Sequence, residues 1–102
     1  MKRNDCLATA EIIVNKDKVK EYGDSYINFQ TIADFWTAYL DVDISKNDVV
    51  NMMILLKLSR AKNGEPKDDT YVDICGYASL GAEFQGEEQD VHDILKSIMN
   101  AR

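Results

Sequence analysis

Residues 57–77 of the chain read KLSRAKNGEPKDDTYVDICGY and contain the turn on which the predicted fold depends. Lys57 and Arg60 stand near the end of one apolar helical pattern, and the loop that follows holds the chain's single proline, Pro66. A second helical pattern then opens with aspartates. Because glycine and proline interrupt helices, this stretch predicts two consecutive helices joined by a short turn. We expect the two helices to pack antiparallel, as a central hairpin.

Outside this hairpin the apolar residues also recur at helical spacing, which predicts an all-α fold, a helical bundle of four to five helices. The length of 102 residues predicts a single domain over 1–102. The first helix is expected to be capped by Asn4 or Asp5. The other predicted helices cover about 26–40, 46–61, 68–83 and 91–99, with a break at 85–86. A capping box is expected at Ser45, with Asp48 as its acidic partner.

Two of the predicted helices carry more apolar surface than a small domain easily buries. In the helix over 26–40, one stripe is expected to be buried and Phe35 and Tyr39 form a second, adjacent stripe. The members of the first stripe are Phe29, Ile32, Ala33, Trp36 and Leu40. The next helix is apolar almost all round over 49–56, and such helices are buried all round. We therefore expect a homo-oligomer. The C-terminal amphipathic helix is expected either to dock on its own core or to complete a dimer interface.

Net charge and cysteine usage restrict the expected partners and location. A net charge of −6 at pH 7 repels nucleic-acid phosphates and anionic lipids, so we expect no nucleic-acid and no membrane partner. Residues 7–14 are too short and too polar for the apolar part of a signal peptide. Cys6 and Cys75 are distant in sequence and have apolar neighbours, which favours buried thiols in a reducing cytoplasm.

Both sides of the predicted hairpin carry charged residues at helical spacing. Asp69, Asp73 and Tyr77 follow one another at intervals of four and share a stripe, so the two carboxylates are candidate ligands for Mg²⁺. Lys57 and Arg60 share a face of the preceding helix and are candidate phosphate contacts. The same acids and bases could instead pair directly as salt bridges between the helices, and the spacing leaves both arrangements open.

Tyr22, Gly23 and Asp24 form a second candidate site before the helix over 26–40. The tyrosine could stack on a base while the helix N-terminus holds a phosphate. The alternative is a plain capped turn. Asp48 lies about half a helical turn away from the Lys57 face, which favours its capping role over a role in metal binding.

Several motifs together resemble a family of short phage and prophage proteins. They are EYGD over 21–24, IAxFW over 32–36, the spaced D, M, K and R of 48–60, and DDxYxDxxGYA over 68–78. The family is similar to phage domains associated with nucleotide modification. More distantly, the chain resembles the MazG-like all-α nucleotide pyrophosphohydrolases, over about residues 11–84.

The resemblance implies an oligomeric all-α protein in the cytoplasm of a bacterial host cell. In the MazG-like enzymes, acidic motifs on two helices hold Mg²⁺ and split a nucleoside triphosphate into monophosphate and pyrophosphate. Asp73 matches the last aspartate of the second motif, while Thr70 stands where that motif has glutamate. The first motif, two glutamates one turn apart, is absent from the helix that begins near Asp48.

The leading hypothesis is a phage-derived protein that handles nucleotides, as a Mg²⁺-dependent nucleoside triphosphate pyrophosphohydrolase. Asp69 and Asp73 would be the catalytic metal ligands. The expected substrate contacts are Lys57 and Arg60 for phosphate, and Tyr22, Asp24 and Tyr77 for the rest of the nucleotide. The alternative is a non-catalytic phage accessory protein that binds a nucleotide or a host protein.

Overall fold

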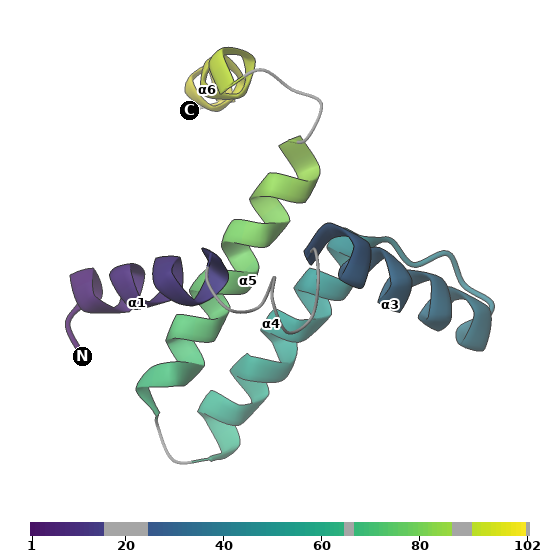
Figure 1. Ribbon diagram of the computed structural model, residues 1–102, viewed down its shortest axis with the longest axis horizontal. Coiled ribbons are helices and arrows are strands. Elements are labelled where there is room, and N and C mark those ends of the chain that lie inside the picture. Colours follow the sequence, from purple (N-terminus) through teal and green to yellow (C-terminus); the bar gives the residue numbers. More distant parts are fainter. Residues whose placement is uncertain (16–24, 65–66, 87–90, 102) are drawn as a thin grey trace.

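The computed structural model describes residues 1–15, 25–64, 67–86 and 91–101 of the chain (Figure 1). Within these ranges it contains helices and no strand. The helices are α1 (Arg3–Asn15), α3 (Ser25–Leu40), α4 (Lys46–Asn63), α5 (Asp68–Gly86) and α6 (Val91–Ala101). The prediction of an all-α fold is confirmed.

Helices α4 and α5 form the predicted antiparallel hairpin and lie side by side in Figure 1. The predicted capping box starts α4. The Asp48 backbone N–H donates to Ser45 Oγ at 3.0 Å, and the Ser45 N–H donates to Asp48 Oδ2 at 2.9 Å. At the other end, the Gly64 N–H donates to the Arg60 carbonyl at 2.9 Å. Both helix ends are thus satisfied locally, and Asp48 serves as a capping residue.

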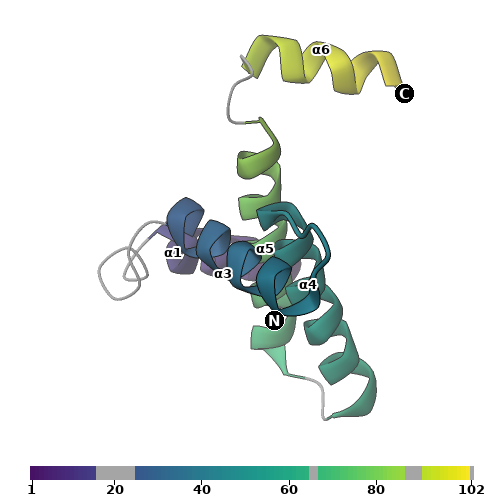
Figure 2. The same ribbon diagram turned by 90° about the vertical axis from the view of Figure 1, so that its right-hand side faces the viewer.

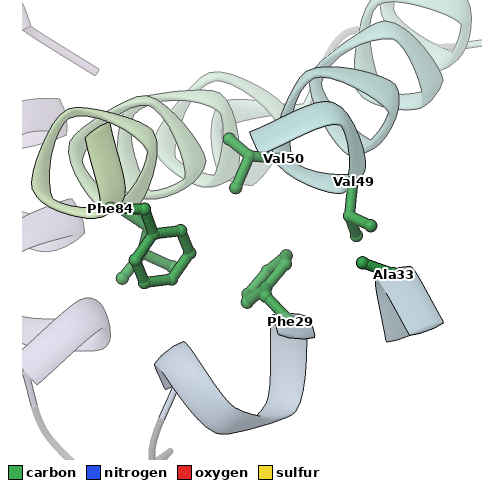
Figure 3. Packing of buried hydrophobic residues seen from close by; sticks show 6 residues of the cluster. Phe29, Ala33, Val49, Val50 and Phe84 are labelled. Carbon is green, nitrogen blue, oxygen red and sulfur yellow. The ribbon is translucent and has the colours of Figure 1, made fainter. Parts of the chain in front are cut away.

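The core lies where α3 packs on the hairpin of α4 and α5, at the end of the hairpin opposite the turn between these two helices. Its buried members come from three helices (Figure 3): Phe29 and Ala33 of α3, Val49 and Val50 of α4, and Leu80 and Phe84 of α5. The Phe29 and Phe84 rings meet with centroids 5.6 Å apart. Helix α1 packs on α5, so the hairpin carries one crossing helix on each of its two arms (Figures 1 and 2).

The connection between α3 and α4 is held by one threonine and by a left-handed residue. Thr37 Oγ1 accepts from the Ile44 N–H at 2.9 Å and donates to the Ile44 carbonyl at 3.1 Å. Asp41, directly after α3, has a φ of 53°. Aspartate tolerates this conformation better than most residues, and it turns the chain back toward α4.

Two predicted helix boundaries are wrong. Helix α1 begins at Arg3, so Asn4 and Asp5 lie inside its first turn and do not cap it. Helix α5 runs to Gly86, about one turn beyond the predicted end at Glu83. The added turn places Phe84 in the core, and the burial of this ring explains why the helix continues through the residues expected to break it.

Fewer apolar side chains of α3 are buried within one chain than the apolar pattern predicts. Leu40, expected in the buried stripe of α3, is 52% exposed, and Phe35 and Tyr39 of the second stripe are 68% and 89% exposed. Phe35 and Tyr39 lie on a side of α3 that its own chain leaves uncovered, and Leu40 is the last residue of the helix. The two-sided burial predicted for α3 therefore does not occur within the described residues of a single chain.

The same holds for α4 and α6. Leu55 and Leu58 of α4 are exposed, so this helix is not covered on all sides by its own chain. Helix α6 stands apart from the hairpin in both views (Figures 1 and 2), and its Leu95, Ile98 and Met99 are exposed. Of the two alternatives expected for α6, these three side chains do not adopt docking on their own core, and the dimer interface and the homo-oligomer stay predictions. Among the described helices, none has both the length and the apolar character needed to span a bilayer.

Candidate functional site

A hollow of about 440 Å³ lies at the turn end of the hairpin, between the last turns of α4 and the first turn of α5. Most of the described residues that line it have polar or charged side chains, and they come from both helices and from Gly64 and Lys67 beside the turn. The lining residues are Lys57, Ser59, Arg60, Asn63, Gly64, Lys67, Asp69 and Thr70. We call it the turn hollow.

Among the described residues that line the turn hollow, cations outnumber carboxylates, although the whole chain has a net charge of −6. Lys57, Arg60 and Lys67 line it together with one described acid, Asp69. Basic residues suit the last turns of α4 because they offset the negative end of its dipole. The first turn of α5 contributes the positive end of a second dipole, and the buried Thr70 donates its N–H to the Lys67 carbonyl at 3.2 Å. The Thr70 N–H is therefore already bonded within the chain, and it is the three cations and the dipole of α5 that favour an anionic ligand.

An ion pair joins the two arms of the hairpin at the inner side of the turn hollow. Lys57 Nζ lies 2.8 Å from Asp73 Oδ2, and the side chains are 17% and 27% exposed. Of the two arrangements that the spacing left open, these two residues adopt the direct salt bridge. Their order along the helices is the one that an antiparallel hairpin predicts.

The two candidate metal ligands line different hollows. Asp69 lines the turn hollow, whereas Asp73 lines a smaller one between α1 and α5 and is engaged by Lys57. Within the described residues no group of three or more His, Cys, Asp or Glu side chains is close enough to hold a metal ion. A Mg²⁺ ion held by these two aspartates would therefore have to complete its coordination with water or ligand oxygens. The Mg²⁺ site stays a prediction.

Of the candidate contacts for a base or sugar, the structure describes Tyr77, which does not line the turn hollow. Tyr77 lines the hollow between α1 and α5, and its ring meets Phe29 edge-on with centroids 6.3 Å apart. It therefore belongs to the margin of the core. Tyr22 and Asp24 lie outside the described residues.

Sequence reasoning missed Lys67 and the polar side chains of Ser59 and Asn63. A signal for Lys67 was present, since a lysine between the proline of the turn and the first aspartate of α5 must lie beside the end of α4 in any tight hairpin. Ser59 and Asn63 carry no comparable signal. Their place in the lining depends on how the helices pack near the turn.

Comparison with known proteins relates this hairpin domain to phage sequences. The family model described as "Domain of unknown function (DUF6378)" matches residues 5–85, which include most of α1, all of α3 and α4, and nearly all of α5. The chain belongs to this family. No solved structure matches the chain. Helix α6 lies outside the matched range of DUF6378.

Two relatives of this DUF6378 chain come from mycobacteriophages. The Gene 55 protein of Mycobacterium phage L5 is 41% identical over 85 residues, which cover 82% of this chain and 54% of the relative. The Gene 55 protein of Mycobacterium phage D29 is 38% identical over 72 residues, covering 71% and 48%. The chain thus spans about half the length of these curated relatives. The expected kinship with phage proteins is confirmed, and the more distant similarity to MazG-like enzymes stays a prediction.

Proposed function

We propose that this DUF6378 chain is a phage-derived protein of the bacterial host cytoplasm that binds a nucleotide or another small phosphorylated ligand in the turn hollow. The observation that carries the proposal is the convergence of Lys57, Arg60 and Lys67 on one hollow of a strongly acidic chain. Surface lysines and arginines usually alternate with acids. Here the described lining brings three cations together with one described carboxylate, Asp69.

The three cations suit different parts of a phosphate group. Arg60 is exposed and can offer the paired N–H donors that match two phosphate oxygens, while Lys67 adds a point charge beside the start of α5. Lys57 is held by Asp73, which fixes the position of its ammonium group. A ligand phosphate would therefore meet one positioned cation and two adaptable ones.

Hydrolysis is the second candidate, and the observation that favours it is the place of Asp69 in the same lining. If Asp69 and Asp73 hold Mg²⁺ with ligand oxygens, the ion would polarise a bound phosphate and lower the pKa of a water on it. For Asp73 this requires competition with the Lys57 ion pair at 2.8 Å. Binding without cleavage has no such requirement, so we rank it first.

Thermal unfolding with a panel of nucleoside mono-, di- and triphosphates, with and without Mg²⁺, tests binding. A ligand at 100 times its Kd stabilises the folded state by about 2.7 kcal/mol, which raises the Tm of a domain of this size by about 10 °C or more. Product analysis with the triphosphates then separates binding from cleavage. No Tm shift with any nucleotide, or with inorganic phosphate, would refute the proposal.

Two variants of α4 form a matched control pair. Arg60→Gln removes a cation from the turn hollow, whereas Lys62→Gln removes one from an exposed position of the same helix that does not line it. We expect Arg60→Gln to weaken binding at least tenfold and Lys62→Gln to leave it nearly unchanged. Equal weakening by both would indicate a general charge effect and count against the turn hollow as the site.

A host protein is the alternative partner, and the exposed apolar side of α3 favours it. Phe35 and Tyr39 present large side chains to solvent there, and such patches are typical of protein contact surfaces. A second copy of the chain could cover the same surface, as the predicted homo-oligomer requires. Light scattering at several concentrations tests the homo-oligomer, and a pull-down from host lysate with Tyr39→Ser as the control tests a host protein.

A further inference from the structure

Cys6 and Cys75 are separated by 69 positions in sequence, yet their Sγ atoms lie only 3.9 Å apart. Cys6 comes from the first turns of α1 and Cys75 from the middle of α5, and both side chains are half-buried. They are the only cysteines of the chain. The sequence predicted two separate buried thiols, so their pairing is a result of how α1 packs on α5.

The packing of α1 on α5 keeps the two thiols beside each other. On α1, Ala10 follows Cys6 by one turn and is buried against α5. On α5, Gly76 follows Cys75, and a Cβ built at Gly76 would lie 3.8 Å from Val14 Cγ2, so α1 approaches this part of α5 closely. A disulfide needs sulfurs about 2 Å apart on Cα atoms separated by about 4.4–6.8 Å. The two sulfurs would have to approach from 3.9 Å to about 2 Å for the bond to form.

We infer that Cys6 and Cys75 form a reversible intramolecular disulfide when the protein meets a hydroperoxide. The thiolate of one cysteine attacks a peroxide oxygen, the O–O bond breaks, and a sulfenic acid and hydroxide result. The second thiol attacks the sulfenic sulfur, and the S–O bond breaks as water leaves. The two sulfurs lose two electrons to hydrogen peroxide, which becomes two waters. A dithiol reductant restores both thiols by exchange.

The disulfide would fasten α1 to the hairpin. Helix α1 makes its main contacts with α5, and covalent closure of a loop this long removes much of the freedom of the unfolded chain. In a reducing cytoplasm such bonds are typically transient and sense oxidants. The oxidised protein is therefore the more stable form, and the reduced protein is the form with the more loosely held α1.

The test uses the full chain, treated with hydrogen peroxide and compared with the reduced protein. We expect the intact mass to fall by two hydrogens, a peptide map without reductant to join the peptides of Cys6 and Cys75, and the Tm to rise by about 10 °C or more. Dithiothreitol should reverse all three changes. Disulfide-linked dimers, or oxygen added to either sulfur without any loss of hydrogen, would overturn the inference.

Cys6→Ser and Cys75→Ser are the control variants, since each keeps one thiol. Neither should lose two hydrogens or gain stability with peroxide, and a dimedone adduct on the remaining thiol would identify which sulfur reacts first. A peroxide-dependent rise in Tm in either variant would show that the stabilisation has another origin and would overturn the inference. If a serine variant does not fold, the mass and peptide map of the wild-type chain decide the question alone.

Discussion

Two glycines of α5 offer a direct test of how closely the hairpin arms approach. Gly76 and Gly81 both lie inside the helix, so replacing either with alanine should gain about 1 kcal/mol of helix propensity. Their surroundings differ. A Cβ at Gly76 would meet Val14 Cγ2 at 3.8 Å, an ordinary contact, whereas a Cβ at Gly81 would meet Val50 Cγ1 at 3.1 Å. Any difference between the two alanine variants therefore reports on the contact with Val50.

Val50 has little room to move away from an added methyl group. It is 1% exposed, and as a β-branched residue in a helix it is largely confined to one rotamer. Overpacking of this kind costs about 1–3 kcal/mol, which equals or exceeds the gain in propensity. We expect Gly76→Ala to stabilise the fold by about 1 kcal/mol, and Gly81→Ala to range from neutral to about 2 kcal/mol destabilising.

Urea unfolding followed by circular dichroism measures both changes, and in thermal unfolding each 1 kcal/mol corresponds to about 4–8 °C. The decisive control repeats Gly81→Ala in a Val50→Ala background. Val50→Ala alone should cost about 2–3 kcal/mol, but in its presence the alanine at position 81 should become stabilising, since the clashing methyl is gone. If Gly81→Ala stabilises the wild-type chain as much as Gly76→Ala does, α4 and α5 do not pack closely where Val50 meets Gly81.

Three further predictions concern caps, the α3–α4 turn and the ion pair. Ser45→Ala should destabilise the protein by about 1 kcal/mol in urea unfolding, because the capping box loses its hydroxyl; no loss would contradict the cap. Asp41→Gly should stabilise by about 0.5 kcal/mol, because glycine suits a φ of 53°, while Asp43→Gly, at a neighbouring exposed position, should not stabilise. A double-mutant cycle of Lys57→Met and Asp73→Asn should give a coupling of about 1 kcal/mol without any ligand, and additive losses would argue against the pair.

The fold was largely predictable because short stretches of sequence carry the signals for its helices. The capping box at Ser45 and Asp48 and the helical spacing of apolar residues are properties of short segments, and the structure confirms both. The errors arise where tertiary contacts override local signals. Burial of Phe84 extends α5 past its expected end, and Leu40 is exposed at the last position of α3, beyond Ala33 and Trp36, which pack in or against the core.

The candidate site was only partly predictable for the same reason. The antiparallel order of Lys57 and Asp73 follows from the hairpin alone, and the structure brings them together. Side-chain periodicity also placed Asp69 and Asp73 on one stripe of α5. It could not tell that the stripe crosses from one hollow to another, because that depends on where α1 lies across α5.

Different parts of helix α5 contribute to the turn hollow, to the contacts with α1 and α4, and to the core. Its first turn closes the turn hollow through Asp69, its middle faces α1 through Cys75 and α4 through Asp73, and its last turns fill the core with Phe84. The Lys57–Asp73 pair connects the first two parts, because Lys57 lines the turn hollow and Asp73 lines the hollow against α1. If a ligand phosphate draws Lys57 away, its ion pair with Asp73 weakens, and Asp73 is a residue that lines the hollow between α1 and α5. We therefore expect ligand binding in the turn hollow to be coupled, through this ion pair, to the packing of α1 on α5. Asp73 stands two positions before Cys75 in the sequence.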